Sequence, residues 1–209
     1  MAILNHKQKK QNKMKKLSII ALLAITTGLV SFTAKMKSTW NYDNTHAKIG
    51  FSVSHMTLSD VDGSFKDVEA TITASNDDLS DAEATFTAKV SSVNTDNEKR
   101  DEHLQNKDFF DAASYPTITF KSTSFTKTKI KNAYVINGDL TMHGVTKKVS
   151  FAAIIKTGIN PYSKKNTAGF KVTGKINRKD FKVGEGTPNA IVGDVININI
   201  NAEFIKADA

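Results

Sequence analysis

The sequence predicts an all-β domain of about eight antiparallel strands. From Trp40 onward, most apolar residues recur at every second position, which is the period of a strand with one apolar and one polar face. Turn-forming pairs such as Asp62-Gly63, Asn137-Gly138 and His143-Gly144 interrupt these runs at short intervals. This spacing favours a meander with short turns over strands joined by helical crossovers.

Eight alternating runs can be recognised, and each is expected to form a strand. They cover residues 49–55, 68–72, 82–90, 118–120, 134–142, 149–155, 170–176 and 196–200. The intervening polar residues, such as Thr71, Thr85 and Asn197, suit a solvent-facing pleat. Since Asn137-Gly138 lies inside an alternating run, a bulge or strand bend competes there with a hairpin turn.

One segment, residues 92–116, departs from the alternation. It contains NEKRDEHLQ, a stretch rich in helix formers, and Thr95 with Glu98 has the spacing of a capping box. A short surface helix is therefore expected. Phe109 and Phe110 follow it outside any strand, where they could plug or line one end of the sheet structure and act as a gate.

The N-terminus has the pattern of a secretory signal peptide. Six lysines and no acidic residue lie within the first 16 residues, and the apolar stretch LSIIALLAITTGLV follows directly. That stretch is shorter than the roughly 20 residues of a spanning helix, so a permanent anchor is the weaker interpretation. We expect residues 1–34 to be a signal peptide, with cleavage after Ala34, residues 38–209 to form one domain, and the protein to be periplasmic or secreted.

Composition excludes several functional classes. The chain has 209 residues, 39% of them hydrophobic, and no cysteine, so it has neither disulfides, nor a thiolate metal site, nor a cysteine nucleophile. The formal net charge is +8, but the 29 basic residues include the six N-terminal lysines, and the remaining 23 nearly balance the 21 acidic residues. A nucleic-acid partner is not expected, because the basicity belongs to the targeting segment.

Strands that are apolar on one face must bury that face, and one short helix cannot cover eight of them. A two-sheet sandwich and a closed barrel both solve this problem, and periodicity does not choose between them. An eight-stranded barrel is just wide enough either to be filled by its own side chains or to hold one slender ligand.

Specific motifs resemble the YceI-like family, in order along nearly the whole domain. They are Trp40-x-x-Asp43-x-x-His46-x-x-Ile49-x-Phe51-x-Val53-x-His55, Gly63-Ser64-Phe65, Arg100-Asp101-x-His103-Leu104, Asp108-Phe109-Phe110-Asp111, Tyr115-Pro116-x-Ile118-x-Phe120, Gly138-Asp139-Leu140-Thr141-x-x-Gly144-Val145-Thr146-Lys147, Gly169-Phe170 and Ile176-x-Arg178-x-Asp180-Phe181. The resemblance implies an eight-stranded antiparallel lipocalin-like β-barrel with one short α-helix. It also implies an exported protein that holds a polyisoprenoid or similar long-chain amphiphile in an apolar cavity, and no enzymatic activity.

The candidate ligand-binding residues are the apolar residues of inward parity, His55 of the same parity as a contact for a polar headgroup, and the two aromatic residues of the non-strand segment. They are Ile49, Phe51, Val53, His55, Phe86, Phe109, Phe110, Phe120, Leu140, Met142, Phe151, Phe170 and Ile198. From the residues alone, an ordinary filled core is the stronger interpretation; the resemblance favours a lumen. The expected partner is a polyisoprenoid, quinone or fatty-acyl lipid, with transient membrane contact and a homodimer left open.

No catalytic, metal or cofactor site is expected. His46 and His55 have opposite parity in an unbroken strand, so they would face opposite sides of the sheet, and no zinc motif is present. Arg100 with Asp101, and Arg178 with Asp180, are interpreted as structural charge pairs. Two alternatives remain: a filled barrel that acts through its surface as an interaction or stress module, and an enzyme on a lipid or quinone with His55 as acid or base.

Overall fold

The computed structural model describes residues 36–208, so the predicted signal peptide lies outside the described residues. Ten strands and one α-helix occupy this range, together with two short 3-10 helices. Their bounds are β1 Ser38–His55, β2 Ser59–Phe65, β3 Val68–Ala74, β4 Glu83–Lys89, η1 Val90–Ser92, β5 Val93–Asn94, α2 Glu98–Gln105, β6 Thr117–Lys127, β7 Ala133–Met142, β8 Val145–Ile159, β9 Asn166–Asn177, η2 Arg178–Phe181 and β10 Val192–Lys206. No helix within this range is both long and apolar enough to cross a membrane.

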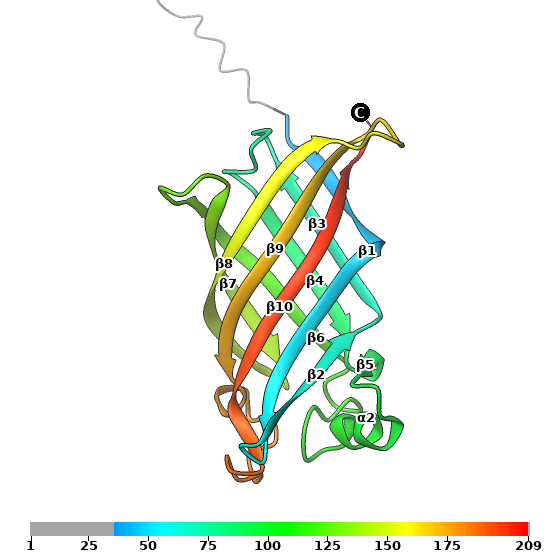
Figure 1. The fold of residues 1–209 in the computed structure, drawn as a ribbon, viewed down its shortest axis with the longest axis vertical. Coiled ribbons are helices and arrows are strands. Elements are labelled where there is room, and N and C mark those ends of the chain that lie inside the picture. Colours follow the sequence, from blue (N-terminus) through cyan, green and yellow to red (C-terminus); the bar gives the residue numbers. More distant parts are fainter. Residues whose placement is uncertain (1–35, 209) are drawn as a thin grey trace, which may run out of the picture. The chain divides into compact units, whose positions relative to one another are not determined.

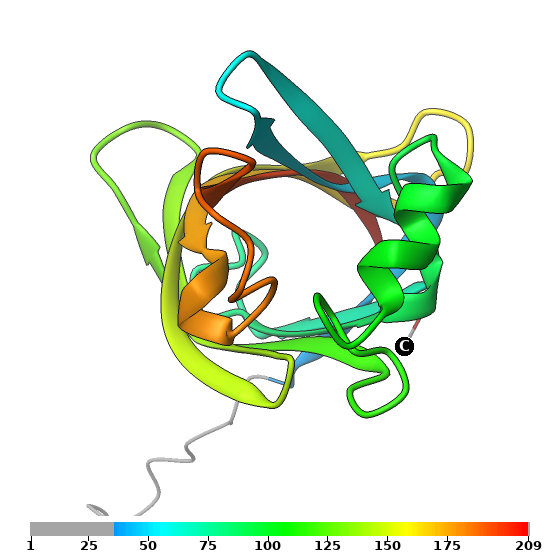
Figure 2. The same cartoon turned by 90° about the horizontal axis from the view of Figure 1, so that it is seen from below.

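The strands close into an eight-stranded antiparallel barrel, as the resemblance implies. Strands β1, β3, β4, β6, β7, β8, β9 and β10 pair in sequence order, and pairing of β10 with β1 completes the ring (Figures 1 and 2). The two remaining strands, β2 and β5, are not counted among the eight strands of the barrel. β2 and β3 both pair antiparallel with β1, at its end and its beginning respectively, and β5 adds two residues to the edge of β2.

The first hairpin turn is not where the sequence indicates it. Asp62-Gly63 lies inside β2, and the chain instead reverses at Met56 and Thr57, where the amide of Leu58 donates to the carbonyl of His55. Both central residues have positive φ, 51° and 59°, as a type I′ turn requires. The prediction of a break at Asp62-Gly63 was wrong because this turn is built without the asparagine and glycine that such turns prefer.

Gly138 is an interior residue of β7, and no turn forms at Asn137-Gly138. The register between β6 and β7 does shift beside this pair, but the extra residue is in β6, between Ser122 and Ser124, and not at Asn137-Gly138 where a bulge or bend was predicted. A larger insertion occurs in β1, where the pairing with β10 jumps from Asp43 to Lys48. This interruption breaks the parity on which the predicted placement of His46 depends.

The short helix is confirmed, but its cap is not the predicted one. Asn97 is the N-cap, and its side chain accepts from the amide of Arg100, so the capping box at Thr95 was wrong. Thr95 is buried and instead donates its hydroxyl to Asp101 at 2.6 Å, while its carbonyl accepts from the Arg100 guanidinium at 2.7 Å. Arg100 and Asp101 therefore attach α2 to the segment that precedes it.

One end of the barrel, which we call the closed end, is covered by the loop between β3 and β4. Leu79 in this loop is fully buried, and it shares a core cluster with Trp40, which is 3% exposed. Tyr134 anchors the loop, because its hydroxyl donates to the carbonyl of Asp78 at 2.7 Å. The side chains at this end therefore fill the barrel.

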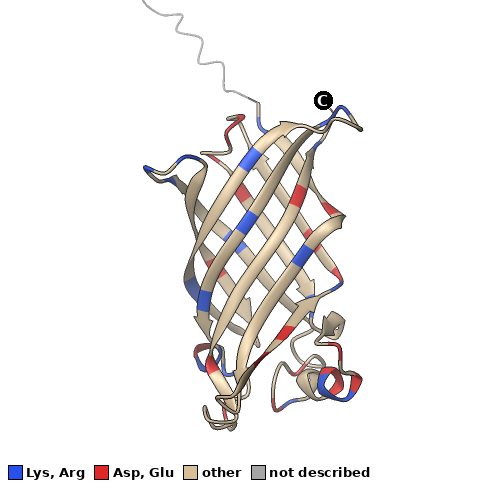
Figure 3. Ribbon diagram, viewed as in Figure 1, with Lys and Arg blue, Asp and Glu red and all other residues tan. Residues whose placement is uncertain are grey.

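The opposite end, which we call the helix end, is bounded by α2 with the 106–116 segment on one side and by the 182–191 loop on the other (Figure 2). Phe109, Phe181 and Val183 belong to a second core cluster at this end. Charged residues lie on the strands and in the loops, with both signs interspersed (Figure 3). Strand residues such as Lys121 and Lys171 are exposed, so the polar face of the pleat is on the outside.

Candidate binding cavity

An apolar cavity of about 240 Å³ lies inside the barrel. Its lining comes from the barrel strands and from the two segments at the helix end, including Leu104, Phe110 and Val183. Nearly all the lining atoms that the cavity exposes are carbon. Such a volume can take hydrocarbon but offers almost no hydrogen-bonding partner to a polar group.

All but one of the candidate residues named from the sequence line this cavity, and His55 is the exception. The lining includes Ile49, Phe51, Val53, Phe86, Phe109, Phe110, Phe120, Leu140, Met142, Phe151, Phe170 and Ile198. His55 is the last residue of β1, beside the turn at Met56, and it is not among the residues that line the cavity. Their contact with a ligand stays a prediction.

The burial of the inward-facing side chains changes along the barrel axis. Near the closed end, Trp40, Ile72 and Ala168 are at most 3% exposed. In the middle, Phe51 and Ile198 face inward but are only half-buried. An apolar side chain that points into the barrel and still has accessible surface must border empty space, so the lumen is not filled by the protein's own side chains.

Aromatic rings connect the lumen with the segment beside α2. The rings of Phe51 and Phe65 lie 5.8 Å apart between centroids, and those of Phe65 and Phe110 lie 5.9 Å apart in a T-shaped arrangement. Phe109 is more deeply buried and meets the ring of His103 edge to face at 5.0 Å. Phe109 therefore anchors the segment; both phenyl rings line the cavity, and that of Phe110 is the less buried of the two.

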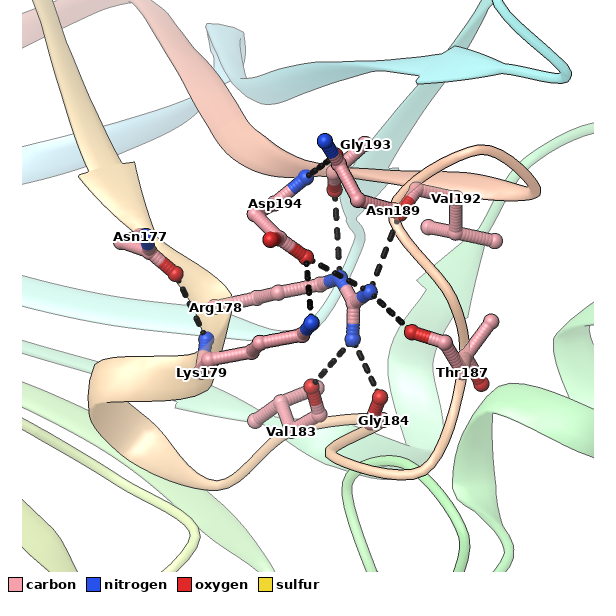
Figure 4. A network of polar contacts seen from close by, with 10 residues as sticks. All are labelled: Asn177, Arg178, Lys179, Val183, Gly184, Thr187, Asn189, Val192, Gly193 and Asp194. Carbon is pink, nitrogen blue, oxygen red and sulfur yellow. Dashed lines mark hydrogen bonds and ion pairs between the residues drawn. The ribbon is translucent and has the colours of Figure 1, made fainter.

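Arg178 is a charged residue in the cavity lining, and it is 2% exposed. Its guanidinium donates to the carbonyls of Gly193 at 3.1 Å, Val183 at 3.0 Å, Thr187 at 2.8 Å and Val192 at 3.0 Å, and also to that of Gly184 (Figure 4). All its nitrogens are thus engaged by the chain between η2 and β10. Arg178 fixes this loop and has no donor left for an anionic ligand.

The ion-pair partner of Arg178 is Asp194, at 2.9 Å, and the predicted pairing with Asp180 was wrong. Lys179 approaches the same carboxylate at 3.3 Å (Figure 4). The structural role was anticipated, but the partner was not, because Asp194 lies across the loop in β10. No short sequence spacing signals that contact.

The alternation of side chains along β1 did not predict that potential metal ligands meet at its insertion. The inserted residues of β1 bring atoms of Asp43, His46 and Glu203 within 4.8 Å of one another. His46 Nδ1 already bonds Asp43 Oδ2 at 2.9 Å, and the His46 side chain is 65% exposed. Hydrogen bonds from Thr45 and His46 lower the pKa of Asp43 to about 2, and the bond to Asp43 raises the pKa of His46. We therefore describe the group as an exposed ion pair.

The fold and the cavity define a class of proteins: antiparallel barrels with an apolar interior and a helical segment at one end. The YceI-like domain model matches residues 40–204, and the chain belongs to this family. Protein YceI of Escherichia coli O157:H7 is 36% identical over 168 residues, covering 78% of this chain and 86% of the relative.

Solved structures agree with this assignment. The YCEI protein of Campylobacter jejuni superposes with a TM-score of 0.68 at 35% identity, covering 74% of this chain and 90% of that one. A polyisoprenoid binding domain from Saccharophagus degradans, implicated in plant cell wall breakdown, gives a TM-score of 0.59 over 80% of this chain and 98% of that one. At 14% identity, the second likeness concerns the fold alone.

Proposed function

We propose that this protein binds a long-chain isoprenoid or similar amphiphilic lipid inside the barrel, for sequestration or transport. The observation that carries the proposal is the half-buried state of inward apolar side chains such as Phe51 and Ile198 around an apolar cavity. The related fold of a polyisoprenoid binding domain supports it. The cavity disfavours the alternative of a filled barrel that acts only through its surface.

The free energy of transfer favours a long chain. Each buried methylene contributes about 0.8 kcal/mol, whereas association costs about 4–15 kcal/mol in lost translational and rotational freedom. A chain of about five buried methylenes would therefore only reach the lower bound of that cost. A polyprenyl, quinone-tail or fatty-acyl chain gives the required surplus.

The proposed mechanism is burial without chemistry. The charged side chain at the cavity, Arg178, is saturated by carbonyls and Asp194, and His55 does not reach the lining. These contacts support a binding protein over an enzyme on a lipid or quinone. Export by a signal peptide in residues 1–34, to the periplasm or the medium, belongs to the same proposal.

Native mass spectrometry of the chain purified from an exporting host, followed by organic extraction, tests this function. We expect a stoichiometric adduct that extracts as an intact prenyl or acyl amphiphile. The variant Ile198→Asp places a charge in the lumen and should lose the adduct, whereas Asn199→Asp places the same charge on the exposed face of β10 and should keep it. A clean apo mass with no uptake of added polyprenyl or fatty-amide lipids would exclude the proposal.

A further inference from the structure

Three inward-facing glycines, two in barrel strands and one in β2, are each covered by a phenyl ring from the neighbouring strand. Gly63 in β2 lies opposite Phe51 of β1 in the register. The other two pairs are Gly138 in β7 with Phe120 of β6, and Gly174 in β9 with Phe151 of β8. All three rings line the cavity.

Each ring occupies the space where a side chain at the glycine would stand. A Cβ at any of these glycines would lie closer than 3.0 Å to carbons of the ring, against 3.4–4 Å for ordinary contact. The rings therefore lie across the glycines, against the wall of the barrel. This arrangement differs from that of Gly158 and Gly169, where an added Cβ meets nothing within 4 Å.

The position of the rings controls the free width of the lumen. Each ring lies between its glycine and the cavity that it lines, so a new side chain at the glycine would push the ring toward the cavity. At Gly138 the new Cβ would also lie 2.6 Å from the carbonyl oxygen of Lys121. Protein interiors are close-packed and do not absorb such volume by compression. One methyl group added at the wall therefore removes space from the lumen through the ring that it pushes inward.

We propose that Gly63, Gly138 and Gly174 determine specificity by keeping the lumen wide enough for a methyl-branched isoprenoid chain. This inference rests on the proposed lipid-binding function and names the ligand class of the same cavity. An unbranched acyl chain needs less width and would survive a narrower lumen. A branched chain would clash, because its methyl groups widen it along its whole length.

The test compares two alcohols, phytanol and hexadecanol, which share the same main chain and differ in methyl branches. Their dissociation constants are measured on the native protein and on Gly174→Ala. We expect Gly174→Ala to lower the affinity for phytanol relative to hexadecanol about tenfold, equivalent to about 1.4 kcal/mol. Gly169→Ala is the matched control in the same strand, and it should leave both affinities unchanged.

The outcomes separate this inference from the function on which it rests. If the native protein binds neither alcohol, the lipid-binding proposal itself fails. If both alcohols bind and Gly174→Ala leaves their affinity ratio unchanged, lipid binding stands and the proposed role of the glycines is wrong.

A second variant tests the same role of the ring if Gly174→Ala alone does not fold. Combining Gly174→Ala with Phe151→Leu removes the ring that the new methyl would displace. This double variant should bind the two alcohols in nearly the native ratio. A tenfold loss of relative phytanol affinity in the double variant would overturn the role of the ring.

Discussion

Replacing Arg178 with methionine should lower the free energy of unfolding by about 3–5 kcal/mol, because a buried charge network loses its central member. Methionine keeps much of the length and the apolar stem of the side chain but donates no hydrogen bond. Five carbonyls then lose their donor, and the carboxylate of Asp194 keeps only Lys179.

The magnitude follows from which acceptors water can reach. Val183 and Gly184 are buried, whereas Thr187 belongs to the outer part of the loop and can be hydrated again. Two buried acceptors without partners cost about 1–3 kcal/mol each. Asp194, with 23% of its side chain exposed, adds a smaller penalty. The total cost of these unpaired acceptors agrees with the free energy lost when a buried ion pair is broken. It is well below the cost expected if all five carbonyls were fully buried.

Urea unfolding measures the loss, and hydrogen exchange locates it. Amides of residues 183–193 should exchange faster in Arg178→Met, since the loop has lost its attachment, while the closed end keeps its protection. Lys179→Met is the matched control: Lys179 contacts the same carboxylate at 3.3 Å but is 37% exposed, so its loss should cost less than about 1 kcal/mol. Equal stability of the two variants would show that the buried guanidinium of Arg178 does not hold the loop in place.

Three further predictions concern other parts of the barrel. The pKa of His46 should lie above its usual value, because its ring bonds to Asp43. The stability that this bond contributes is therefore complete below the pKa of histidine in the unfolded chain, and it is lost as the pH rises through the raised pKa of the folded protein. An NMR titration of His46 should show its pKa return to the usual value in Asp43→Asn. Leu79→Ala should lower the free energy of unfolding by about 2–5 kcal/mol, because a fully buried side chain at the closed end is truncated, and a loss below about 1 kcal/mol in urea would contradict that role. Phe110→Asp should abolish lipid retention in the extraction assay, whereas Tyr162→Asp, at a side chain that is 94% exposed, should not; unchanged retention in folded Phe110→Asp would remove Phe110 as a gate.

The period-two pattern determined most of the fold. It located the barrel strands and put residues such as Phe51, Phe120 and Ile198 on the inner face, because alternation of side chains is a local property of an extended chain. The helix was predicted from its high content of helix-forming residues. The secondary structure thus followed from local patterns, whereas closure of the strands into a barrel was predicted from the resemblance to the family.

The alternation pattern did not predict the irregular parts of the backbone. The turn at Met56 and Thr57 adopts positive φ without glycine or asparagine, so no local signal marks it. The insertion in β1 shifts His46 relative to the pleat and brings it to Asp43. Parity fails after such an insertion, since each extra residue reverses the direction of every side chain that follows.

Local sequence patterns were enough to predict the strands, the short helix and the apolar residues that face inward. The cavity beside these residues, the pairing of Asp194 with Arg178 and the phenyl rings over Gly63, Gly138 and Gly174 appear only in the folded barrel. These are contacts between strands, and they depend on register, barrel closure and the space left between side chains. Alternation specifies which way a residue points but not what lies in front of it.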